Sequence, residues 1–114
     1  MSDGVYDFTE DRKHTRDYRN TTPDIYEAFN AFDATVFAEE GREIPLKYRE
    51  LIALAVGITT QCVYCIDAHS KAAVKAGATM TELSEASWVA TAIRAGGGFA
   101  HGRLAFKLSG EHEH

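Results

Sequence analysis

Both prolines of this sequence lie within its first 45 residues, and the absence of proline from the rest of the sequence restricts the folds that it can adopt. The chain has 114 residues and two prolines, Pro23 and Pro45. Beyond Pro45 only glycines interrupt a long series of apolar residues at helical spacing. No Asn-Gly or Asp-Gly turn separates two alternating apolar runs, as a β-hairpin would need. The sequence therefore predicts an all-α fold, a compact bundle of roughly five or six helices.

Start and stop signals divide the chain into these helices. Thr22 and Pro23 suit an N-cap and a first helical position, and Gly77 suits the left-handed residue after a helix. Thr79 and Glu82 have the spacing of a capping box. The expected helices are about 7–18 with Thr9 as its cap, 23–38, 45–60, 61–76, 80–96 ended by Gly96-Gly97-Gly98, and 98–108.

The run Leu51 to Ile58 is apolar on all sides of a helix, so we expect it to be central and buried. A strand is the alternative, because several of its residues are β-branched, and a strand there would suit a thioredoxin fold. That fold would normally place Gly-Pro between its two cysteines, where this chain has Val63-Tyr64, and it needs a proline downstream. The thioredoxin fold is therefore rejected.

Length and charge limit the functional classes. We expect one domain over residues 1–114, with a core of about 20–108. A net charge of −5 argues against nucleic-acid binding, which needs a basic face. No secretory signal or membrane span is visible, so we expect a cytoplasmic protein without a membrane partner. A small alanine-rich core and an aromatic-bearing arm at 1–20 predict apolar surface that neighbouring subunits cover.

The chemistry of the chain centres on its two cysteines. Cys62 and Cys65 form one C-x-x-C motif, and His69 follows Cys65 by one helical turn. A thiol reacts as its thiolate, which both a helix N-terminus and a neighbouring base favour. His69 can accept the Cys65 proton, and Glu50, at the last polar turn before an apolar helix, can support His69. Cys62 and Cys65 can also close a disulfide, as a thiol peroxidase cycle requires.

Other interpretations of these residues remain open. Cys62, Cys65 and His69, with His101 as a fourth ligand, could hold zinc, although the spacing fits neither common zinc-finger pattern. The cysteines could also be packing residues or a redox sensor in a non-catalytic helical oligomer. The peroxidase interpretation uses no cofactor and no metal.

The combined pattern of Glu50, Cys62, Cys65 and His69 resembles the core of alkyl hydroperoxidase D, in the carboxymuconolactone decarboxylase-like superfamily. The flanking segments Arg49 to Val56, Ala76-Gly77-Ala78 and Thr81-Glu82-Leu83 agree with it, so the resemblance covers about residues 45–101. One departure is Tyr64, since the better-known members carry histidine immediately before the second cysteine.

This resemblance implies an all-α fold assembled as a trimer or hexamer, with peroxidase activity toward hydroperoxides. By the same resemblance Cys65 is the peroxidatic thiol, Cys62 the resolving thiol, and His69 with Glu50 the proton relay. The implied reductant is a dithiol on a lipoyl-bearing or thioredoxin-like protein. The decarboxylase branch lacks the cysteine pair, which argues against lactone decarboxylation.

Overall fold

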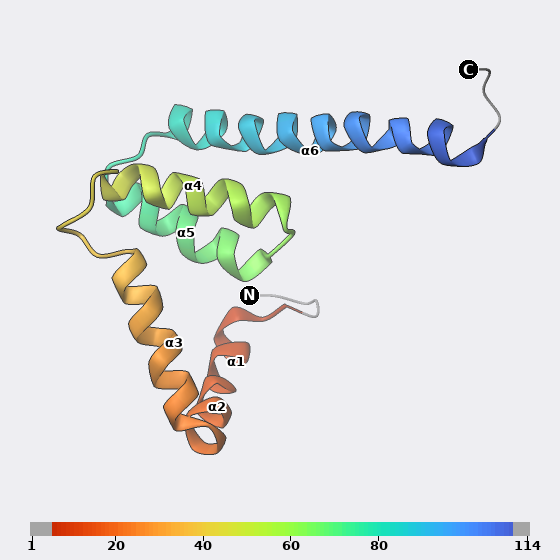
Figure 1. Ribbon diagram of the computed structural model, residues 1–114. Coiled ribbons are helices and arrows are strands. Elements are labelled where there is room, and N and C mark those ends of the chain that lie inside the picture. Colours follow the sequence, from red (N-terminus) through yellow and green to blue (C-terminus); the bar gives the residue numbers. More distant parts are fainter. Residues whose placement is uncertain (1–5, 111–114) are drawn as a thin grey trace. The chain divides into compact units, whose positions relative to one another are not determined.

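The computed structural model describes residues 6–110, and all regular structure in them is helical. This confirms the all-α fold class. The helices are α1 (Phe8–Lys13), α2 (Thr15–Thr21), α3 (Pro23–Val36), α4 (Leu46–Thr59), α5 (Val63–Lys75) and α6 (Met80–Ser109) (Figure 1). The chain divides into two units between Glu43 and Ile44, with α1 to α3 in the first and α4 to α6 in the second.

In the first unit, the single helix expected at 7–18 is wrong. Asp7 rather than Thr9 is the N-cap of α1, because its carboxylate accepts the Glu10 N–H at 3.1 Å. At His14 the backbone N–H bonds to Asp11 at 3.0 Å, a three-residue step that separates α1 from α2. Pro23 begins α3 as expected.

The apolar stripe of α3 is exposed within the chain. Ile25, Phe29 and Phe32 lie largely open, and a cleft of about 700 Å³ runs along α2 and α3 beside Tyr18 and Tyr26. These apolar side chains recur at helical spacing along α3, but they do not form the core of its own unit.

In the second unit α4 is the central helix and packs against both α5 and α6 (Figure 1). The buried apolar side chains of this unit are small or medium-sized: Leu51, Leu54, Ala73, Ala78 and Ala90. Ile52 and Val56 are half exposed, so the expectation that 51–58 is buried on all sides is wrong within this chain. Within the described part of this unit, α5 and α6 pack against α4 and leave the side with Ile52 and Val56 open.

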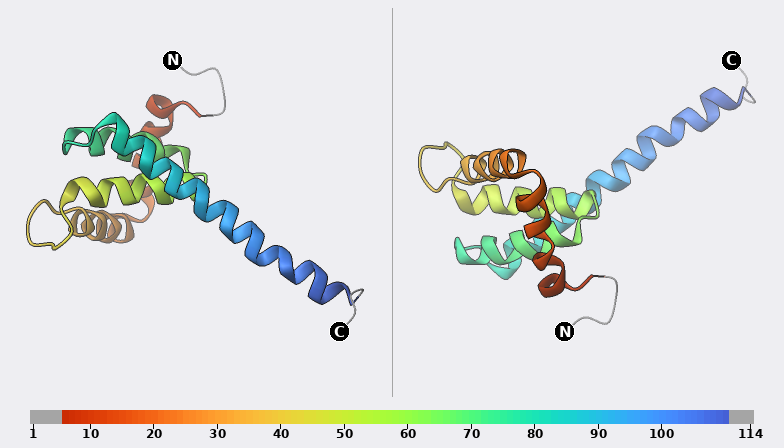
Figure 2. Two further views of the ribbon diagram at one scale, coloured as in Figure 1. Left: turned by 90° about the horizontal axis from the view of Figure 1, so that it is seen from above. Right: turned by 90° about the horizontal axis from the view of Figure 1, so that it is seen from below.

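The predicted break at Gly96-Gly97-Gly98 is also wrong, because α6 runs through these glycines as one helix of 30 residues. Its far half extends beyond α4 and α5 in both views of Figure 2. None of the three glycines has a positive φ, and no proline or capping residue follows them. Glycine costs about 1 kcal/mol in a helix but does not by itself stop the hydrogen-bond ladder.

Two further boundary signals are confirmed. Thr79 and Glu82 form both hydrogen bonds of the capping box at the start of α6. Gly77 and Gly110 have φ of 104° and 72°, the left-handed conformation that follows a helix. Among residues 6–110, no helix combines the length and hydrophobicity needed to cross a bilayer.

Candidate functional site: a cysteine pair beside a buried carboxylate and a histidine

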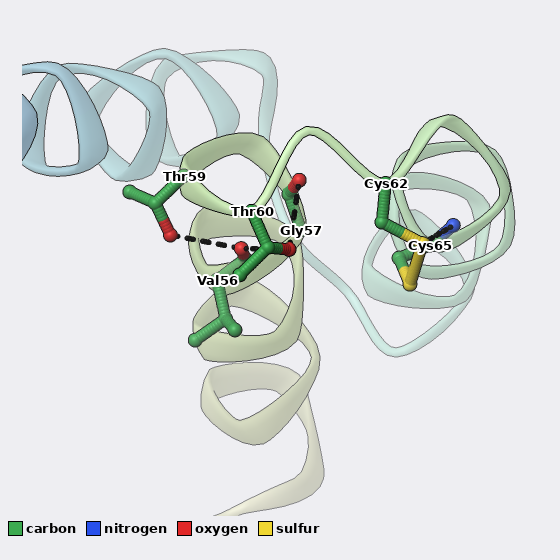
Figure 3. The surroundings of a disulfide bond; sticks show 6 residues. All are labelled: Val56, Gly57, Thr59, Thr60, Cys62 and Cys65. Atoms are coloured by element: carbon green, nitrogen blue, oxygen red, sulfur yellow. Dashed lines mark hydrogen bonds between the residues drawn. A yellow bond between two sulfur atoms is a disulfide. The ribbon is translucent and has the colours of Figure 1, made fainter.

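A tight turn carries the chain from α4 to the cysteines. The hydroxyls of Thr59 and Thr60 donate to the Val56 carbonyl at 2.8 and 2.9 Å, which closes the last turn of α4 (Figure 3). Gln61 then takes a left-handed conformation with φ of 58°. A non-glycine residue in that region is uncommon and costs about 1 kcal/mol or more, and such residues concentrate at functional sites. The reversal delivers Cys62 to the start of α5.

The contacts of α4 with α6 support this turn. The Arg94 guanidinium of α6 donates to the Thr59 carbonyl, at the carboxyl end of α4. At the other end of α4, Lys47 forms an ion pair with Glu82 at 3.0 Å. The Glu82 carboxylate raises the pKa of Lys47. The Thr79 N–H first, and Lys47 second, lower the pKa of Glu82.

Cys62 and Cys65 are joined as a disulfide, with their Cα atoms 5.2 Å apart (Figure 3). Cys62 is the N-cap of α5, and its Sγ accepts the Cys65 N–H at 3.2 Å. An amide at the first turn of a helix stabilises negative charge on the sulfur that it contacts. The amide at the start of α5 therefore contacts the sulfur of Cys62. His69, by contrast, lies one helical turn beyond Cys65.

Glu50 and His69 meet across the α4–α5 contact. Glu50 Oε1 lies 2.6 Å from His69 Nδ1, and Glu50 is only 6% exposed. A buried carboxylate needs such a partner, because burial without one is costly. With Nδ1 occupied by the carboxylate, a thiol proton taken up by the imidazole would go to Nε2.

A second α4–α5 contact lies beside the first and brings Gly57 to the cysteines. Gly57 lies two turns after Glu50 on the same face of α4. Cys65 lies one turn before His69 on the same face of α5. The Gly57 carbonyl accepts the Cys62 N–H at 2.9 Å. A Cβ added to Gly57 would lie 3.0 Å from the Cys65 Cβ.

Sequence reasoning did not select Gly57. Its only signal was a lone glycine inside an apolar helix, which often marks close packing.

Two other residues singled out from the sequence, Tyr64 and His101, are exposed. Tyr64 is exposed on the first turn of α5. His101 is exposed on α6, where its Nδ1 lies 3.1 Å from the Gly97 carbonyl. Within residues 6–110, no three histidine, cysteine or acidic side chains are grouped so that they could hold a metal ion.

Comparison with known proteins identifies the family. The model of the carboxymuconolactone decarboxylase family matches residues 23–108. The chain belongs to the carboxymuconolactone decarboxylase family. The match includes Glu50, Gly57, both cysteines and His69, so all the site residues lie inside the family domain.

Individual proteins are also similar to this chain. A Paracoccus denitrificans protein called "uncharacterized protein 4 in cox locus" is 40% identical over 87 residues, which are 76% of this chain and 77% of that protein. An uncharacterized Haemophilus influenzae protein is 38% identical over 73 residues, 58% of this chain and 63% of that protein. A crystal structure of a Methanobacterium thermoautotrophicum protein has a TM-score of 0.70 at 29% identity, covering 78% of this chain and 98% of that one.

Proposed function

We propose that this member of the family is a thiol-dependent peroxidase that reduces hydroperoxides through Cys62 and Cys65. The observation that carries the proposal is the combination on two packed helices: a closed cysteine pair on α5, and a histidine of α5 bound to a buried carboxylate of α4. A purely structural disulfide would have no need of the histidine–carboxylate pair. Buried carboxylate–histidine pairs are a standard arrangement for proton transfer.

In the first half of the cycle, His69 accepts the Cys65 proton while Glu50 stabilises the resulting imidazolium. The Cys65 thiolate attacks the outer peroxide oxygen and the O–O bond breaks. The leaving alkoxide takes the proton from His69, which gives an alcohol and a sulfenic acid on Cys65.

In the second half, Cys62 attacks the Cys65 sulfur and the sulfenic oxygen leaves as water. The helix N-terminus favours the Cys62 thiolate needed for this step, since the Cys65 N–H already points at Cys62 Sγ. The product is the disulfide present in the structure. An external dithiol then restores both thiols by exchange and becomes oxidised itself. The sum is one hydroperoxide and one dithiol converted to alcohol, water and a disulfide.

The cycle requires a hydroperoxide as substrate and a dithiol as reductant. The family resemblance implies that the dithiol is presented by a lipoyl-bearing or thioredoxin-like protein. The cycle suits a reducing compartment such as the cytoplasm, where such dithiols are maintained.

Turnover of tert-butyl hydroperoxide with dihydrolipoamide and with reduced thioredoxin tests the proposal. The native chain should turn over with at least one donor. Cys65→Ser should abolish reaction with peroxide, whereas Cys62→Ser should still reduce one equivalent and stop at the sulfenic acid. Oxidation of the native pair without turnover on any donor would instead indicate a redox sensor. Reactivity retained in Cys65→Ser and lost in Cys62→Ser would reverse the assigned roles.

A further inference from the structure

Gly57, in the last turn of α4, lies against both cysteines. Its carbonyl accepts the Cys62 N–H at 2.9 Å, which ties Cys62 to α4. The Cα of Gly57 faces the first turn of α5. A Cβ added there would lie 3.0 Å from the Cys65 Cβ and 3.5 Å from the Ile66 amide nitrogen. Figure 3 shows Gly57 in the last turn of α4, where the chain turns toward Cys62 on α5. The two cysteines are therefore positioned by one and the same residue.

We propose that Gly57 is a positioning residue that sets the redox potential of the Cys62–Cys65 pair. It does so by fixing Cys62 through its carbonyl and by letting the first turn of α5 come close enough for Cys65 to reach Cys62. This deepens the proposed peroxidase function, since it requires that the pair cycle between dithiol and disulfide.

The physical argument rests on what a side chain at this position would displace. A separation of 3.0 Å between two Cβ atoms is shorter than their van der Waals contact, so one group must move. The obstructing atoms belong to the stem and backbone of Cys65 and Ile66, which cannot rotate away as the end of a long side chain can. The first turn of α5 must therefore shift away from α4.

Such a shift would strain the turn that carries both cysteines. Cys62 is held to α4 by the carbonyl of residue 57 and to α5 by its own carbonyl, which accepts the Ile66 N–H at 3.0 Å. Moving the first turn of α5 away from α4 therefore pulls on Cys62 from both sides and changes the separation of the two sulfurs. A disulfide tolerates only a narrow range of separations, and the oxidised form is then disfavoured relative to the two thiols.

The experiment is an equilibrium titration of Gly57→Ala against a dithiothreitol redox buffer, without hydroperoxide. In this exchange dithiothreitol loses two electrons and two protons, and the disulfide becomes two thiols. We expect the equilibrium constant for forming the protein disulfide to fall about tenfold, which corresponds to about 30 mV. The matched control is Gly96→Ala in α6, where an added Cβ would have no atom within 4 Å. The control should keep the native potential.

A second measurement covers the case in which Gly57→Ala folds poorly. Urea unfolding of the oxidised and the reduced variant should show a larger loss of stability in the oxidised form. Equal losses in both forms, complete unfolding of both included, would show that Gly57 only packs and would overturn the proposal. An unchanged potential in a folded variant would overturn it too. Because no peroxide is present, absence of peroxidase activity in the native chain would leave this result unaffected.

Discussion

Glu50→Gln gives a direct test of the carboxylate–histidine pair, because it removes the charge and keeps the shape. The glutamine oxygen can still accept a hydrogen bond from His69 Nδ1, now 2.6 Å from Glu50 Oε1. What is lost is the stabilisation of the imidazolium that forms as Cys65 gives up its proton.

The structure allows the size of this effect to be worked out. A hydrogen bond to a charged group contributes about 1.5–3 kcal/mol and a neutral one about 0.5–1.5 kcal/mol. The difference, about 1–1.5 kcal/mol, corresponds to roughly a tenfold slower reaction of Cys65 with peroxide. Because the retained hydrogen bond still satisfies the buried group, the free energy of unfolding should change by no more than about 1 kcal/mol.

The assay follows the loss of free thiols after fully reduced protein is mixed with excess tert-butyl hydroperoxide. Glu85→Gln is the matched control, since Glu85 is an exposed acid in the same unit and its replacement changes net charge equally. A native rate in Glu50→Gln would refute the reasoning. So would an equal fall in both variants, because it would indicate an effect of net charge alone.

Three further predictions concern Glu82, the glycines of α6 and at residue 77, and self-association. Thr79 and Lys47 lower the pKa of Glu82 below its ordinary 4.5, so their contacts stabilise the fold above that pH and this stabilisation is lost as the pH falls through the folded-state pKa. The urea midpoint of the native chain should therefore decrease between roughly pH 5 and 3, and it should decrease less in Glu82→Gln. Gly97→Ala should stabilise the continuous helix α6 by up to about 1 kcal/mol in urea unfolding, whereas Gly77→Ala, at a φ of 104°, should destabilise. The exposed apolar side chains of α6 predict self-association, for which the family resemblance implies a trimer or hexamer, and sedimentation as a monomer at all concentrations would contradict it.

Much of the site could be predicted because its residues obey simple spacings. Cys65 and His69 are four residues apart on one helix, so they share a helix face whatever the rest of the fold. Their proximity therefore follows from α5 alone. Glu50 lies on another helix, and it is predicted as the partner of His69 because a carboxylate at the last polar turn before an apolar run needs a partner; the family resemblance implies the same role. The 2.6 Å contact agrees with that placement, while the catalytic roles stay predictions.

Gly57 and Gln61 show why the rest could not be predicted. A lone glycine in an apolar helix has several explanations, and only the packed α5 reveals which atoms a Cβ would meet. Gln61 adopts its left-handed conformation because the turn into Cys62 demands it, and nothing in its side chain signals this.

The missed continuity of α6 has a different origin. The low helix propensity of Gly96-Gly97-Gly98 predicts a break there, whereas a helix ends only where its carbonyls find another arrangement, as they do at Gly110.

The most direct test of the central claim is a thiol titration of the reduced native chain before and after one equivalent of an organic hydroperoxide at neutral pH. The peroxidase account predicts that both thiols disappear together, that one equivalent of alcohol forms, and that a dithiol restores both thiols. Survival of the two thiols unchanged would contradict it.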